Sequence, residues 1–198
     1  HLNDTSDIIY GSADIALNIK DSEDRVRLDL ISQGKDGMGM EVKKVTFNGS
    51  EVSYSHDNDV LLIETGVLEY SSRDIINVVY SGMPITGLII GPNMHGDRTF
   101  FSDNWPNKAR NWLPIVDHPY DKSTAEFVVI APNHYQVISN GLLVEETNLN
   151  KELKKTHWKQ SVPISCWLYA LGVAEFAVDY VDYFEGKSIQ TWVYKQDR

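Results

Sequence analysis

Residues 109–122 read Ala-Arg-Asn-Trp-Leu-Pro-Ile-Val-Asp-His-Pro-Tyr-Asp-Lys, and this stretch decides how the rest of the chain is interpreted. Its mixture of aromatic, charged and proline residues follows neither the alternation of a strand nor the period of a helix. Pro114 and Pro119 each fix their own φ angle and bias the preceding residue toward extended geometry. The stretch therefore predicts a rigid, turn-rich path of the kind found at a site or a junction.

Around this stretch, alternating apolar residues predict half-buried strands along most of the chain. Asn48-Gly49 and Asn140-Gly141 each lie between two apolar runs, and this dipeptide favours a two-residue hairpin turn. Helical periodicity is nearly absent. The sequence therefore predicts an all-β chain of stacked antiparallel sheets. The expected strands include residues 15–19, 26–30, 59–64, 76–80, 124–130, 153–160, 173–184 and 187–194.

The segment 82–119 interrupts this rhythm, because glycines and prolines are closely spaced among its aromatic residues. It is too long and too apolar for a solvent-exposed linker, and long ordered excursions are commonly functional loops. We expect it to carry four aromatic residues to one end of the sheet stack, namely Phe100, Phe101, Trp105 and Trp112.

Length and composition fit a single domain over residues 1–198, because a chain of 198 residues with 42% hydrophobic content can bury a sizeable core. No apolar run approaches the roughly 20 residues of a membrane span, and the polar residues 1–4 are not typical of a signal peptide. The formal net charge of −10 argues against binding to nucleic acid, which needs clustered lysine and arginine. We therefore expect no membrane span and no nucleic-acid partner.

The chain has one cysteine, Cys166, which lies among apolar residues. An intramolecular disulfide is therefore excluded, and a buried thiol is favoured over a reactive nucleophile. This leaves a cytoplasmic, periplasmic or secreted location open.

Arg110 allows two interpretations, a substrate-binding cation or a structural guanidinium that bridges Asp117 or Asp121. The structural role is favoured, because the forked donors of arginine suit a carboxylate in the same turn-rich segment. For Trp105, a role in a pocket wall and ordinary packing are equally favoured. Packing is favoured for the other tryptophans, Trp112, Trp158, Trp167 and Trp192.

The opening stretch resembles a motif in the N-terminal domain of the zinc aminopeptidase family that includes aminopeptidase N and leukotriene hydrolase. Two further family-like stretches, 139–142 and 163–176, follow in the expected order. This resemblance covers nearly the whole chain and implies a saddle-like all-β domain that lies beside a catalytic domain and closes one side of its cleft. The matching positions in the opening stretch are Ala109, Arg110, Trp112, Pro114, Asp117, Pro119 and Lys122.

The family's zinc site uses a histidine-glutamate-x-x-histidine motif, in which two histidines one helical turn apart share the metal. No two histidines of this sequence have that spacing, and the family's glycine-x-methionine-glutamate-asparagine loop for the peptide amine is also missing. The resemblance therefore implies a zinc aminopeptidase as the whole protein. We expect no catalytic residue and no metal in this chain. A missing catalytic domain of the same protein would hold the zinc and cleave the first peptide bond at peptide N-termini.

Many members of the family place a glutamine or glutamate five residues before the arginine, where it helps line the pocket for the first substrate side chain. This sequence has Trp105 there. The resemblance implies that Trp105 and Asn104 contact substrate, while Arg110, Asp117 and Pro119 support the loop. An indole offers apolar area and one donor but no acceptor, so the preferred first residue stays open.

Two other classes of function fit the composition. A carbohydrate-binding β-sandwich module also combines many strands with tryptophan and tyrosine residues that could stack on sugar rings. A structural interaction domain would use an exposed apolar edge as its docking face. Neither explains why three family-like stretches occur in order.

Overall fold

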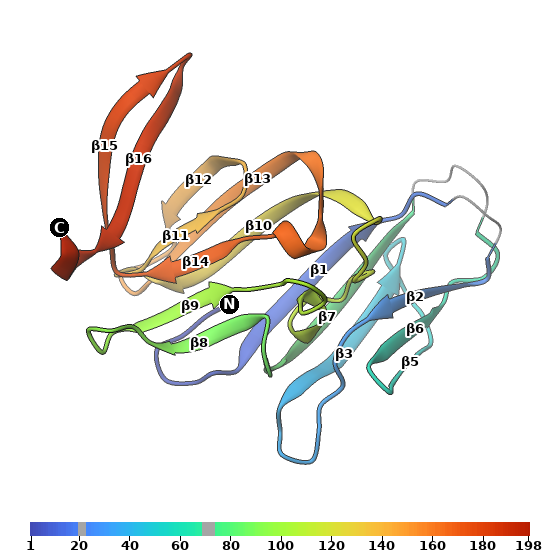
Figure 1. The fold of residues 1–198 in the computed structure, drawn as a ribbon. Helices are drawn as coiled ribbons and strands as arrows, with labels where there is room; N and C mark the ends of the chain where they lie inside the picture. Colours follow the sequence, from blue (N-terminus) through green and yellow to red (C-terminus); the bar gives the residue numbers. More distant parts are fainter. Residues whose placement is uncertain (20–22, 69–73) are drawn as a thin grey trace.

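A computed structural model of the chain describes residues 1–19, 23–68 and 74–198, and strands dominate it (Figure 1). The first half contains β1 (Ile9–Ala16), β2 (Arg25–Asp29), β3 (Gly39–Phe47), β4 (Ser50–Glu51), β5 (Tyr54–Asp57), β6 (Val60–Glu64), β7 (Ile75–Met83), β8 (Leu88–Pro92) and β9 (Arg98–Ser102). The second half contains β10 (Lys122–Pro132), β11 (Gln136–Ser139), β12 (Leu142–Asn148), β13 (Leu153–Ser165), β14 (Leu171–Ala174), β15 (Phe176–Phe184) and β16 (Lys187–Tyr194). Three short 3-10 helices are η1 (Ala109–Asn111), η2 (Cys166–Leu168) and η3 (Lys195–Asp197).

The described strands pair into five sheets, with the orders β1-β7-β3-β4, β2-β6-β5, β11-β14-β9-β8, β10-β13-β12 and β15-β16. Every paired strand is antiparallel to its neighbour. This confirms the predicted all-β fold of stacked antiparallel sheets.

Strand β7 illustrates how the alternating pattern builds the core. Ile76, Val78 and Tyr80 are buried, while the residues between them are partly exposed. The same buried cluster includes residues from the later sheets, such as Phe100 and Val173. Both halves of the chain therefore share a core, and each fully buried aliphatic side chain contributes about 1.5–3 kcal/mol of transfer free energy.

One of the two predicted hairpins is confirmed. Phe47 pairs with Ser50, and Asn48 and Gly49 have φ angles of 48° and 83°, as a two-residue turn of this type requires. The prediction at Asn140-Gly141 is wrong, because β11 pairs with β14 whereas β12 pairs with β13. The side-chain oxygen of Asn140 accepts from the amide of Ala170 over 2.6 Å, so this turn carries the chain from one sheet to another.

Two further expectations need correction. Residues 173–184 do not form one strand, because β14 ends at Ala174 and β15 begins at Phe176 in a different sheet. The segment 82–119 is not a loop throughout, since it contains the β8–β9 hairpin. Phe100 is therefore in the central core and not at an end of the stack. The alternation at 15–19 also extends past the strand, which ends at Ala16.

Candidate functional site

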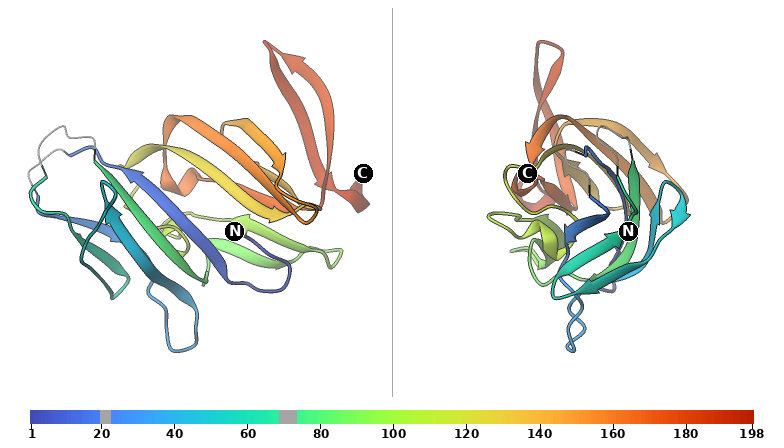
Figure 2. Two further views of the ribbon diagram at one scale, coloured as in Figure 1. Left: turned by 180° about the vertical axis from the view of Figure 1, so that it is seen from behind. Right: turned by 90° about the vertical axis from the view of Figure 1, so that its right-hand side faces the viewer.

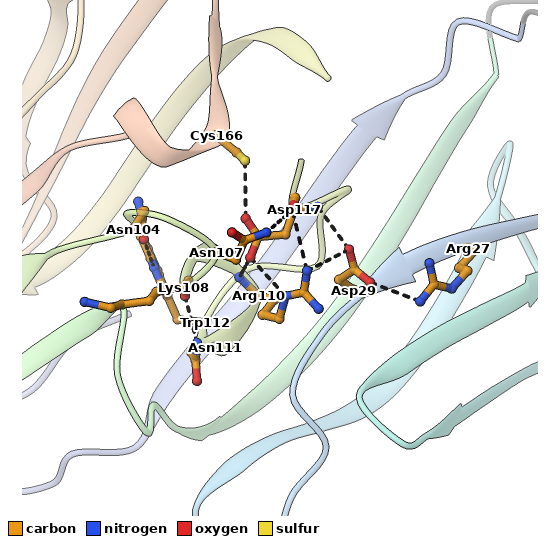
Figure 3. Close-up of polar contacts among 10 residues, drawn as sticks. All are labelled: Arg27, Asp29, Asn104, Asn107, Lys108, Arg110, Asn111, Trp112, Asp117 and Cys166. Atoms are coloured by element: carbon orange, nitrogen blue, oxygen red, sulfur yellow. Dashed lines mark hydrogen bonds and ion pairs between the residues drawn. The ribbon is translucent and has the colours of Figure 1, made fainter. Parts of the chain in front are cut away.

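The segment that links β9 to β10 spans residues 103–121, and we call it the junction loop. It makes a short 3-10 turn at η1 and is fixed by a network of polar contacts to distant elements (Figure 3). All five site residues expected from the sequence lie on this loop. The structure gives them different environments: Asn104 and Asp117 are buried, whereas Trp105 is exposed.

Asn104 lies inside the domain, where only 2% of its surface is exposed. Its amide nitrogen donates to the carbonyl oxygen of Tyr169 over 2.7 Å, and its side-chain oxygen accepts from the indole nitrogen of Trp112 over 2.9 Å. Trp112 in turn stacks on Phe127 with ring centroids 6.0 Å apart. Both ends of the Asn104 amide are thus bonded within the domain, and they join the start of the loop to η1 and to the chain before β14.

Arg110 contacts two carboxylates. Its Nε donates to Asp117 Oδ2 over 3.0 Å, and one of its terminal nitrogens lies 3.4 Å from Asp29 Oδ2. The Asp117 side chain has no exposed surface, and that of Asp29 is 12% exposed. Because charged groups are seldom buried without partners, the guanidinium is the natural counter-charge for both acids.

Asp29 was missed in the sequence because it precedes Arg110 by 81 residues. It ends β2, where the neighbouring Leu28 and Leu30 are both buried. A carboxylate between two core leucines is unusual, and this was the available signal. Backbone bonds from Asp29 to Ile115 and from Asp117 to the Asp29 carboxylate then attach the loop to β2.

Asp117 also contacts the other side of the loop. Its carbonyl oxygen accepts from the side chain of Asn107 over 3.0 Å, and its Oδ1 lies 3.4 Å from the Cys166 sulfur. Cys166 is buried, as the sequence predicted. Burial, and then the hydrogen bond to Asp117, raise the pKa of this thiol to about 12, so it is a neutral donor to the carboxylate.

Pro119 lies in the last turn of the junction loop, and its carbonyl oxygen accepts from the hydroxyl of Ser165 over 2.8 Å. Beside it, the rings of His118 and Tyr120 stack with centroids 5.3 Å apart. The end of the loop is therefore attached to the end of β13, next to the point where Cys166 reaches Asp117.

Trp105 differs from the other four residues, because 64% of its surface is exposed. It follows the buried Asn104 directly, so a fixed backbone carries an exposed indole. Trp105 is therefore not packed in the core of this domain. Trp112 and Trp158 are buried, as expected.

The described residues do not fit a catalytic zinc. Within residues 1–19, 23–68 and 74–198, no group of three or more His, Cys, Asp or Glu side chains could hold a metal ion. The buried pair Asp29 and Asp117 is already occupied by a guanidinium. No helix among these residues is long and apolar enough to cross a membrane.

Comparison with known families gives a match between residues 1–168 and the model described as Peptidase M1 N-terminal domain. The chain belongs to this family. The resemblance seen in the sequence is thereby confirmed, and the matched range includes the whole junction loop together with Cys166.

Relatives of this M1 N-terminal domain include the glutamyl aminopeptidase of Rattus norvegicus, 33% identical over 75 residues, which are 38% of this chain and 8% of that protein. The leucyl aminopeptidase of Saccharolobus solfataricus is 25% identical over 144 residues, 71% of this chain and 18% of its own. A crystal structure of an M1 zinc metallopeptidase from Deinococcus radiodurans has the same fold, with a TM-score of 0.76 at 20% identity. The aligned residues cover 91% of this chain and 41% of the Deinococcus radiodurans chain. The chain thus spans less than a fifth of these two curated relatives.

Proposed function

We propose that residues 1–198 form the single non-catalytic N-terminal domain of a zinc-dependent aminopeptidase. The zinc and the residues that act on the peptide bond would lie in a catalytic domain outside this sequence. Membership of the M1 N-terminal family and the aminopeptidase names of the relatives support this proposal. The substrates would be peptides with a free N-terminus.

Within that protein, the junction loop would help to shape the peptide-binding cleft. The observation that carries this role is the exposed Trp105 on a backbone fixed at Asn104. An exposed indole on a rigid segment offers a large apolar contact with little loss of conformational entropy. We assign Trp105 to the wall of the pocket for the first substrate side chain.

The other four residues would then act as supports. Asn104 would act by positioning, since both ends of its amide are bonded inside the domain. Arg110 and Asp117 would hold the middle of the loop against β2, and Pro119 would hold its end against β13. Preorganisation of this kind matters because a small displacement of a contact residue weakens binding and catalysis.

A panel of amino-acid p-nitroanilides tests the role of Trp105. In the protein translated from the uninterrupted reading frame, Trp105→Ala should change the ratio of kcat/KM between large apolar and small first residues by about tenfold, the loss expected for one good apolar contact. Tyr120→Ala is the matched control, because Tyr120 is an aromatic of the same loop that is 90% exposed. An unchanged ratio in Trp105→Ala would remove Trp105 from the pocket.

A further inference from the structure

The β15–β16 hairpin projects away from the rest of the molecule in all three views (Figures 1 and 2). Its two strands pair with each other and with no other described strand. An isolated two-stranded hairpin is marginally stable at best in water. A projecting ribbon of this length therefore needs an additional source of stability.

The base of the hairpin is well anchored. Phe176 meets Phe101 edge to face, stacks on Tyr194 and contacts Trp192, with ring centroids 5.8–6.2 Å apart. Just after β16, a carboxylate oxygen of Asp197 lies 2.9 Å from Nε2 of His95, and this contact ties η3 to the β8–β9 turn. The direction in which the ribbon projects is thus fixed by contacts at its base.

The distal half, residues 180–189, is exposed along its whole length, and we call it the hairpin arm. Between 47% and 66% of the surface of its large apolar residues is accessible, and these residues are Tyr180, Val181, Tyr183, Phe184 and Ile189. Five exposed apolar side chains within ten residues are far more than a solvated turn needs, and such patches mark interaction surfaces.

We propose that the hairpin arm docks on the part of the same protein that lies outside this sequence, and so fixes the N-terminal domain relative to the catalytic domain. This inference rests on the proposed function. The alignment with a two-domain M1 zinc metallopeptidase covers 93% of this chain but only 43% of that protein. If the whole protein is built like that one, more than half of it lies outside this domain and could bind the arm. The arm lies beyond residue 168, where the family match ends.

A second copy of the chain is the less favoured occupant. Each copy carries a formal net charge of −10, and like charge of this size opposes self-association. The arm itself has two acidic residues, Asp182 and Glu185, and one basic residue, Lys187. Two arms brought together would add to this repulsion.

Hydroxyl-radical footprinting of the whole protein, translated from the uninterrupted reading frame, tests the docking. Tyr183 is 65% exposed here and Tyr10 on β1 is 56% exposed, so the two tyrosines are matched in residue type and surface. If the arm is docked, Tyr183 should be oxidised about fivefold more slowly than Tyr10, because the centre of an interface excludes water. Equal rates for Tyr183 and Tyr10 would overturn the proposal.

Two controls make the result specific. Phe184→Ser should lower the thermal midpoint of the whole protein, whereas Leu142→Ser, at a side chain 73% exposed on β12, should leave it unchanged. Protection of Tyr183 that disappears on dilution, together with dimers in sedimentation, would identify a second copy as the occupant and overturn the proposal. Zinc content and aminopeptidase activity of the same wild-type sample test the proposed function separately, because footprinting does not depend on either.

Discussion

The indole nitrogen of Trp112 donates to the side-chain oxygen of Asn104 over 2.9 Å, and both side chains are buried. Between them in the chain lies Trp105, which is 64% exposed. The loop thus closes on itself through a buried hydrogen bond and leaves one indole outside. This arrangement places an exposed indole on a backbone that is held by buried hydrogen bonds.

Asn104→Ala should lower the free energy of unfolding by about 2–3 kcal/mol, because it leaves the Trp112 donor buried without a partner. Urea denaturation of the wild type and the variant measures this loss. Trp112→Phe and the double variant complete a thermodynamic cycle, and the coupling energy should be about 1 kcal/mol. Strictly additive effects would show that the bond contributes nothing.

Asp117→Ala should lower the free energy of unfolding by about 2–4 kcal/mol, since it leaves the partly buried Arg110 without its nearest carboxylate. Arg27→Ala is the control, because Arg27 also contacts Asp29 but its side chain is 64% exposed. A surface pair of this kind contributes at most about 1 kcal/mol. Equal losses in the two variants would contradict the structural role of Asp117.

Gly141→Ala and Gly49→Ala separate steric clash from backbone strain. Both glycines have positive φ, 86° and 83°, so alanine is strained at each by about 1 kcal/mol. A Cβ at position 141 would also lie 2.0 Å from the carbonyl oxygen of Lys159, whereas one at position 49 meets nothing within 4 Å. Chemical denaturation should therefore show a clearly larger loss for Gly141→Ala, and equal losses would contradict the crossing between sheets at Asn140-Gly141.

Cys166 should be unreactive in the folded protein. At pH 8 a disulfide reagent such as Ellman's should label no thiol natively and one per chain in guanidinium, because the chain has a single cysteine and it is buried. Its pKa is raised from 9.0 to about 12 by burial, so the unfolded chain releases this proton first as pH rises. Stability from this group is complete below pH 9 and is lost between about pH 9 and 12. Rapid native labelling at pH 8 would contradict the buried contact with Asp117.

Local patterns predicted much of this fold, and long-range contacts explain the errors. Alternation located the strands because one face of each sheet is buried. The dipeptide at Asn48-Gly49 was read correctly, but the same dipeptide at Asn140 joins strands of different sheets, since its side chain bonds Ala170. Turn chemistry fixes the backbone of a turn and does not choose the partner strand.

The candidate site shows the same limit. The contact between Arg110 and Asp117 could be predicted from the sequence, because both residues lie in one turn-rich stretch. The contacts of Asp29 and Tyr169 with the junction loop could not be predicted, because they form only when the sheets have folded. The inward position of Asn104 likewise depends on Tyr169, and it separates Asn104 from the exposed Trp105.

The most direct test of the account measures zinc and activity on an amino-acid p-nitroanilide panel, for this chain and for the protein from its uninterrupted reading frame. We expect about one zinc per chain and hydrolysis only in the longer protein, as for a site whose metal ligands lie outside this domain. If the longer protein is metal-free and inactive, the aminopeptidase assignment is wrong. Zinc-dependent hydrolysis by residues 1–198 alone would contradict the assignment of the zinc and the catalytic residues to a separate domain.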